Sequence, residues 1–106
     1  MQTRLDVEVE VNGSLLHSPS MLFMPGQEAE IRVEEEGRDS FVVRVTENMM
    51  VRVTVPIYAP DGTLAGKPDV TMKPGESSNL EFSMDATTYA VAIRTVATQV
   101  AGDEPR

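Results

Sequence analysis

Apolar and polar residues alternate along most of the chain with a period of two. Between Leu5 and Val11 every second residue is apolar, and Asp6, Glu8 and Glu10 stand between them. A period of two places one set of side chains on the buried face of a β-strand and the other set in solvent. The same alternation recurs at 29–33, 41–45, 51–57, 80–84 and 89–93. No window of ten residues combines helical spacing with capping residues, so the sequence predicts little or no helix.

Turn residues separate these segments. Asn12-Gly13 supplies the positive φ angles of a two-residue hairpin, and Pro25-Gly26 is typical of a tight turn. Pro19 and Pro68 mark a strand edge or a break inside two further apolar segments. Counted in this way, the chain has about eight strands at roughly twelve-residue spacing, which is typical of a small all-β sandwich or barrel.

The turn signals occur twice in the chain. Four of them return forty-nine positions later: Gly13, Pro19, Pro25 and Gly26 reappear as Gly62, Pro68, Pro74 and Gly75. Near the end the offset falls to forty-eight, because the loop at 85–87 is shorter than the acidic loop at 34–39. We therefore predict a sandwich of two tandem four-strand repeats, residues 5–46 and 51–97, which pack face to face around a pseudo-twofold axis.

Length, charge and composition limit the number of domains and the classes of partner that we expect. A chain of 106 residues is long enough for one core, so we expect a single β-sandwich domain over residues 5–97 and a flexible tail over 98–106. The net charge of −8 repels phosphate backbones and anionic lipids, so nucleic acid and membranes are not expected as partners. The lack of cysteine excludes disulfides, thiolate metal sites and cysteine nucleophiles. No run of eighteen apolar residues is present, so direct membrane insertion is not expected.

The segment from Ser18 to Val33 carries a family resemblance. It resembles part of the secretin domain of bacterial outer-membrane secretion and pilus channels, where a Ser-Pro pair precedes an apolar strand and the next strand reads Ala-x-Ile-x-Val. The matching residues are Ser18, Pro19, Leu22, Ala29, Ile31 and Val33. Pro25-Gly26 stands in place of the family's usual asparagine pair, and Glu34 in place of its usual glycine. The resemblance covers about sixteen residues, implies the same local hairpin and transfers no catalytic residue.

The resemblance also implies an origin in the bacterial envelope. Met1 is not followed by a basic and then apolar leader, so we expect no signal peptide in the sequence as given. A small, cysteine-free β domain that begins directly with a strand fits a protein whose leader has been removed. We expect a periplasmic or other extracytoplasmic location, while a cytoplasmic location stays open.

Two groups of carboxylates are candidate sites. The loop residues Glu34, Glu35, Glu36 and Asp39 could supply oxygens to Ca²⁺, but their spacing matches no known cation loop and consecutive extended side chains point apart. We interpret this loop as a solvated segment that keeps a strand edge from pairing, and we expect no metal or other cofactor.

The second group is the stripe of Asp6, Glu8 and Glu10, with Glu28 and Glu30 expected alongside. Such a stripe could dock a basic partner, or mark an edge strand protected from aggregation. It could equally be balanced by cross-strand pairs. We favour the last interpretation, in which Arg32, Arg44, Arg52 and Arg94 neutralise these carboxylates through cross-strand pairs.

Methionine is unusually frequent, with seven in the chain. Thioethers are soft ligands suited to Cu(I), so His17, Met21 and Met24 form a candidate copper site if they converge. Packing in the core is the favoured alternative, because methionine fills irregular gaps and several of these residues fall on the alternating apolar face. If Leu22 and Met24 face outward while Met21 and Phe23 face inward, the outward pair makes a small apolar patch.

No catalytic constellation is present in the sequence. His17 is the only histidine and has no recognisable nucleophile or acid in its vicinity, so an enzyme is not expected. A carbohydrate-binding module is a further alternative, which would need Tyr58 or Tyr89 exposed beside a groove. The favoured function is a non-enzymatic protein-binding or structural module, with sheet edges near Pro19 and Pro68 and the run 21–24 as contact surfaces. The residues expected at the interaction surface are Met21, Leu22, Met24, Asp6, Glu8 and Glu10.

Overall fold

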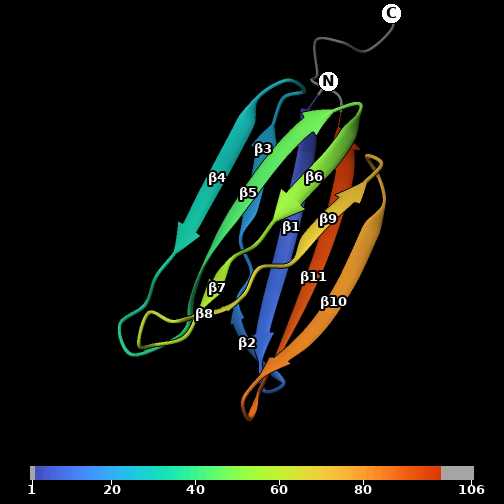
Figure 1. Cartoon of the computed structure of the whole chain (residues 1–106). Helices are drawn as coiled ribbons and strands as arrows, with labels where there is room; N and C mark the ends of the chain where they lie inside the picture. Colours follow the sequence, from blue (N-terminus) through green and yellow to red (C-terminus); the bar gives the residue numbers. More distant parts are fainter. Residues whose placement is uncertain (1, 99–106) are drawn as a thin grey trace, which may run out of the picture.

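The computed structural model describes residues 2–98, which form two β-sheets packed against each other and contain no helix (Figure 1). The strands in this range are β1 (Gln2–Val11), β2 (Ser14–His17), β3 (Ser20–Phe23), β4 (Glu28–Val33), β5 (Ser40–Asn48), β6 (Met50–Thr54), β7 (Ile57–Tyr58), β8 (Leu64–Gly66), β9 (Asp69–Met72), β10 (Ser77–Met84) and β11 (Thr87–Thr98). The all-β prediction is therefore confirmed. Of the predicted tail, residue 98 ends β11, and 99–106 lie outside the described residues.

The two sheets are antiparallel throughout. Sheet A has the order β10-β11-β1-β2, and β3 pairs with β1 on the same side as β2. Sheet B has the order β8-β7-β5-β6-β9, and β4 pairs with the other side of β5. β1 is thus an interior strand, so the expectation that its charges protect an edge is wrong.

The described residues form eleven strands, and the predicted count of eight is not confirmed. Three expected strands are each interrupted near a proline, at Pro19, Pro56 and Pro68, because proline has no N–H to donate to a ladder. The chain nevertheless stays close to the adjacent segment at these breaks, because the carbonyl of each proline accepts a backbone hydrogen bond from that segment. Val7 N–H donates to the oxygen of Pro19 at 3.0 Å, and Val55 N–H to that of Pro68 at 2.9 Å.

The two predicted units do not form one sheet each. Residues 5–46 supply β1–β3 to sheet A and β4–β5 to sheet B, whereas 51–97 supply β6–β9 to sheet B and β10–β11 to sheet A. The expected face-to-face packing of whole units is therefore wrong. The physical reason lies in the turn at Pro25-Gly26, which carries the chain from one sheet to the other, so that β3 and β4 are not a paired hairpin.

Strand pairing within the first unit recurs in the second. Thr3 pairs with Phe23, and the residues forty-eight and forty-nine positions later, Val51 and Met72, also pair. The pairing of β4 with β5 recurs at the same offsets between β10 and β11. The register shift where β1 meets β2 recurs where β7 meets β8.

The core lies between the two sheets and is built from the alternating apolar positions. The central strands β1, β5, β6 and β11 contribute most of it, and each inward valine or isoleucine is worth about 1.5–3 kcal/mol when buried. The largest fully buried side chains are Leu5, Val7, Val9, Phe41, Val43, Val45, Val51, Val53, Val55, Ile57, Tyr89 and Ile93. Since these side chains face inward, the intervening residues of each strand form the outer faces of the sheets.

Candidate functional site

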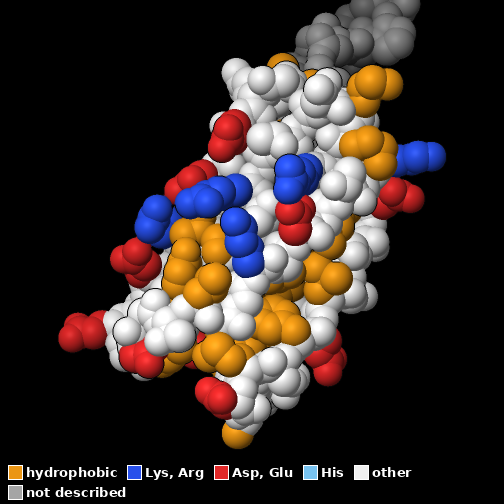
Figure 2. Space-filling view, in the orientation of Figure 1, with side chains coloured by type: hydrophobic (Ala, Val, Ile, Leu, Met, Phe, Trp, Pro, Cys, Tyr) orange, Lys and Arg blue, Asp and Glu red, His pale blue; other side chains and the backbone are white. Residues whose placement is uncertain are grey.

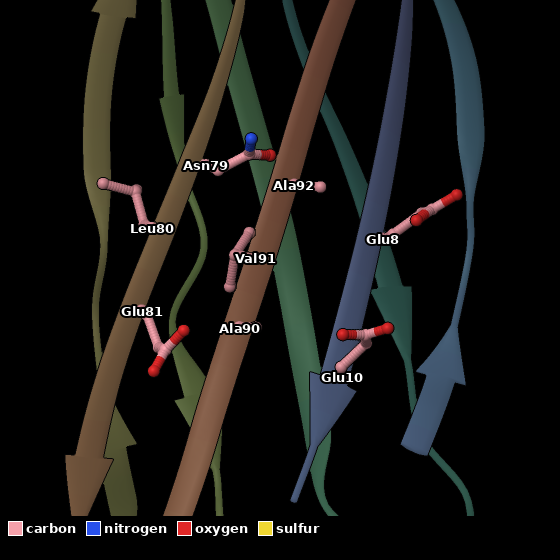
Figure 3. Close-up of a pocket in the computed structure, with 8 residues that line it drawn as sticks. All are labelled: Glu8, Glu10, Asn79, Leu80, Glu81, Ala90, Val91 and Ala92. Carbon is pink, nitrogen blue, oxygen red and sulfur yellow. The ribbon is translucent and has the colours of Figure 1, made fainter. Parts of the chain in front are cut away.

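The outer face of sheet A carries a shallow groove along β11. Ala92 lies between Glu8 of β1 and Asn79 of β10, and Ala90 lies between Glu10 and Glu81 on the same two strands. Because alanine side chains are short, the residues on either side form walls around a hollow of about 330 Å³. Figure 3 shows β11 in the middle of this hollow, flanked by β1 and β10.

The carboxylates of this groove are not neutralised. Within residues 2–98, none of Glu8, Glu10 and Glu81 forms an ion pair. Adjacent strands lie about 4.8 Å apart, so the backbones of Glu10 and Glu81 face each other across β11 at about 10 Å. This spacing leaves room for a cationic group between two carboxylates. We name Glu8, Glu10, Asn79, Glu81, Ala90 and Ala92 the acidic groove.

The outer face of sheet B differs, because it carries arginines that pair with carboxylates of neighbouring strands. The guanidinium of Arg44 contacts Glu30 at 3.2 Å, and that of Arg52 contacts Asp69 at 2.6 Å. The hydrogen bond between Arg52 and Asp69 lowers the pKa of the carboxyl and raises that of the guanidinium. Figure 2 shows Lys and Arg side chains gathered close to Asp and Glu side chains on the visible face.

This arrangement overturns the predicted charge balance of the first strand. Arg32, Arg44 and Arg52 lie on sheet B, together with Glu28 and Glu30, so they cannot pair with Glu8 or Glu10 on sheet A. The sequence pattern did not show that these charges lie on two different sheets, because β1 and β4 alternate apolar and charged residues in the same way.

Asp6 differs from its two neighbours on the stripe. Its carboxylate contacts Arg4 at 3.3 Å and accepts a 2.7 Å hydrogen bond from Ser20 Oγ. Arg94, the remaining arginine expected to balance the stripe, is the residue opposite Asp6 on β11. One end of the face is therefore mixed in charge, and the end that carries Glu8, Glu10 and Glu81 is acidic.

The predicted apolar contact residues divide between the surface and the core. Leu22 is 57% exposed and Met24 is 37% exposed, whereas Phe23 is buried. Met21 is half-buried and packs against the core opposite Leu5, so it does not contribute to an outward patch. Leu22 pairs with Arg4, which places it on the outer face of sheet A beyond the mixed end.

The structure does not bring the candidate copper ligands together. His17 and Met21 follow one another along the sheet edge, opposite Val9 and Leu5, and four residues of extended chain span about 13 Å. Met24 lies beyond the end of β3, farther along the same edge. His17 Nδ1 instead accepts a 3.1 Å hydrogen bond from the N–H of Ser18.

The acidic loop and the tyrosines also lie apart from the groove. Glu35 contacts Arg38 at 3.2 Å, and Asp39 accepts a 2.7 Å hydrogen bond from the hydroxyl of Tyr89. Tyr89 is buried, with a pKa raised to about 12 by burial and by this bond, so its ring is not a carbohydrate platform. Tyr58 is half-buried. Among residues 2–98, no three His, Asp or Glu side chains are grouped as metal ligands.

Sequence reasoning found Glu8 and Glu10 but missed the rest of the groove. Asn79 and Glu81 come from β10, which the sequence could not place across β11 from β1. A signal was nevertheless available in β11, where Ala90 and Ala92 occupy outward positions between the buried Tyr89, Val91 and Ile93. Two adjacent outward alanines on an interior strand leave a depression between larger neighbours.

Comparison with known proteins gives no significant match, whether to a protein-family model, a curated protein or a solved structure. Within the described part of the chain, no helix is long and apolar enough to cross a membrane.

Proposed function

We propose that the chain is a non-enzymatic protein-binding module that docks a cationic segment of another protein on the outer face of sheet A. The observation that carries this proposal is the acidic groove, whose three carboxylates form no ion pair within residues 2–98 and lie around two alanines, whereas Glu30 and Asp69 on sheet B pair with arginines.

Charge complementarity determines the choice of partner. The groove is acidic, and the whole chain carries a net charge of −8, so both the local and the long-range fields attract lysine and arginine. A side chain that reaches over Ala90 would place its cation between Glu10 and Glu81. Because these carboxylates are solvent-exposed or half-exposed, binding weakens as salt screens the attraction.

The test is a titration of the domain with an eight-residue peptide that alternates lysine and valine, followed by NMR chemical shifts. The triple variant Glu8→Gln, Glu10→Gln and Glu81→Gln should bind about tenfold more weakly. A matched control, Glu28→Gln, Glu34→Gln and Glu35→Gln, changes the net charge equally but alters other parts of the surface. Equal weakening by the two variants, or no binding by the unaltered domain, would contradict the proposal.

We further propose a location in the periplasm or another extracytoplasmic part of the bacterial envelope. The support is the resemblance of Ser18–Val33 to the secretin segment. Fractionation of the source cells with an antibody against the domain tests this location, and recovery in the cytoplasm would contradict it.

We also propose that the domain is an internal duplication with pseudo-twofold symmetry, reducible to eight strands when each proline-interrupted pair is counted as one. The support is that each pair of strands joined within the first unit has a counterpart within the second, at offsets of forty-eight and forty-nine. The pairing between the two units is less regular. Val7 pairs with Ile93, whereas the residues at the equivalent positions, Val55 and Val45, do not pair with each other, because Val45 pairs with Val53. Superposition of residues 5–46 on 51–97 in an experimental structure tests the symmetry.

A further inference from the structure

We propose that the cationic partner binds as an added β-strand along the free edge of β10. This inference rests on the proposed function and specifies its mode: the partner extends sheet A by one strand, so that its outward lysine or arginine side chains lie beside Glu81 and reach across β10 towards Ala90. Strand addition supplies affinity through backbone hydrogen bonds and specificity through alternate side chains.

β10 presents a long and regular edge. It runs for eight residues without a proline or a break, and it pairs with β11 along its whole length. Within the described residues, no backbone hydrogen bond joins β10 to any other strand. In an antiparallel ladder, every second residue directs its N–H and C=O away from its partner, so the free edge of β10 offers donors and acceptors to an incoming strand.

The other edges are protected in ways that β10 lacks. The edge formed by β2 and β3 is broken at Pro19, and the edge formed by β8 and β9 is broken at Pro68. β4, which corresponds to β10 in the strand pairing, is shorter and carries alternating charges at Glu28, Glu30 and Arg32. Such breaks and charges discourage strand pairing. The outward residues of β10 are Ser77, Asn79, Glu81 and Ser83, with a single charge.

The two sides of β10 define the side chains that an added strand would need. On the inward side Leu80, Phe82 and Met84 are only half-buried, and hydrophobic side chains follow the seam between β10 and β8–β9 in Figure 2. Apolar side chains of the partner would cover this seam. On the outward side the partner would lie beside Glu81. The fitting partner is therefore a strand that alternates apolar and cationic residues.

The experiment compares the alternating lysine–valine peptide with a version that is N-methylated at its four central residues, two lysines and two valines, so that both edges of the peptide strand lose donors. Methylation keeps the charges but removes N–H donors, and N-methyl groups obstruct strand pairing. We expect binding to fall by tenfold or more on methylation. We also expect the unmethylated peptide to slow hydrogen exchange at alternate amides of residues 77–84, and to leave exchange at the β4 edge unchanged.

The outcomes separate the two proposals. If both peptides bind equally and the triple glutamine variant weakens both, the docking function stands and strand addition is overturned. If neither peptide binds, both proposals fail. Sedimentation of the free domain tests whether a second copy of the chain occupies this edge. If the free domain is a dimer and its β10 amides are already protected from exchange, the edge binds a second copy and the proposal is overturned.

Discussion

The hydroxyl of Tyr89 in sheet A donates a 2.7 Å hydrogen bond to Oδ2 of Asp39, which precedes β5 of sheet B. The bond joins residues fifty positions apart and ties the β4–β5 loop to the opposite layer. The ring of Tyr89 is buried and stacks on Phe82 with centroids 5.1 Å apart. The acidic loop is thus anchored at its last residue by a contact from the core.

Replacement of Tyr89 by phenylalanine should lower the free energy of unfolding by about 1–2 kcal/mol. The ring stays in place, but a hydrogen bond to a charged acceptor is lost, and half-buried Asp39 recovers part of the loss from water. Urea unfolding of the wild type and of Tyr89→Phe measures the difference. Asp39→Asn, which keeps an acceptor oxygen, is the matched control and should cost less. An unchanged midpoint in Tyr89→Phe would show that the bond contributes nothing.

The burial of Tyr89, together with the same bond, predicts a loss of stability in alkali. The folded-state pKa of Tyr89 is raised to about 12, whereas an unfolded tyrosine titrates near 10. The folded state therefore holds its proton more tightly, so this stabilisation is complete below pH 10 and is lost as the pH rises from 10 towards 12. The loss is on the order of 2 kcal/mol and should be absent in Tyr89→Phe. The measurement is urea unfolding of the wild type and of Tyr89→Phe at pH 9, 10 and 11. An equal loss of stability in both proteins would contradict the prediction.

Gly66 of β8 is a position where the packing, and not the backbone, requires glycine. A methyl group there would overlap the ring of Phe82, whose Cζ would lie 2.6 Å away. The ring has little freedom to move away, because it stacks on the buried Tyr89. Gly66→Ala should therefore destabilise the fold by about 1–3 kcal/mol, although alanine normally stabilises by stiffening the unfolded chain.

The check on Gly66 is a double-mutant cycle in urea. In a Phe82→Leu background the added methyl group gains room, so Gly66→Ala should cost markedly less than in the wild type. An equal cost in both backgrounds would assign the effect to the backbone of β8 and not to Phe82.

The sequence predicted the strands and the local turns well, because those depend on neighbouring residues. Asn12 and Gly13 have φ angles of 52° and 82°, and they connect β1 to β2 as the hairpin pattern required. The turn at Pro25-Gly26 was also correctly located, and Gln27 N–H bonds to Met24 at 3.2 Å. What failed was the assignment of the flanking strands to one hairpin. A tight turn is compatible with pairing or with a change of sheet, and only the burial of distant strands decides between them.

The same limit applies to the acidic groove and its neighbouring edge. Alternation placed Glu8 and Glu10 on one exposed face, but it could not place Glu81 across β11 from them. Whether Arg44 neutralises Glu10 or Glu30 depends on the sheet in which each strand lies. The free edge of β10 depends likewise on which strands remain unpaired. Pairing of strands far apart in the sequence therefore creates the candidate site, while local pattern supplies only its parts.

Thr95 fixes the turn before β10 through its buried hydroxyl. Its Oγ1 accepts a 2.9 Å hydrogen bond from the N–H of Gly75 and donates one of 2.9 Å to the carbonyl of Glu76. Valine has nearly the same shape but cannot make either bond, so Thr95→Val should cost about 1–3 kcal/mol. Thr95→Ser keeps the hydroxyl and loses only a methyl group, so it should cost about 1 kcal/mol. Because the turn sets the start of β10, Thr95→Val should also speed amide exchange at residues 75–78. The equivalent turn in the first unit is the control, since there the N–H of Gly26 bonds to the backbone oxygen of Glu47 at 2.7 Å. Amide exchange at that turn should change less. Equal stability of the valine and serine variants, with unchanged exchange at both turns, would show that the hydroxyl does not hold this turn.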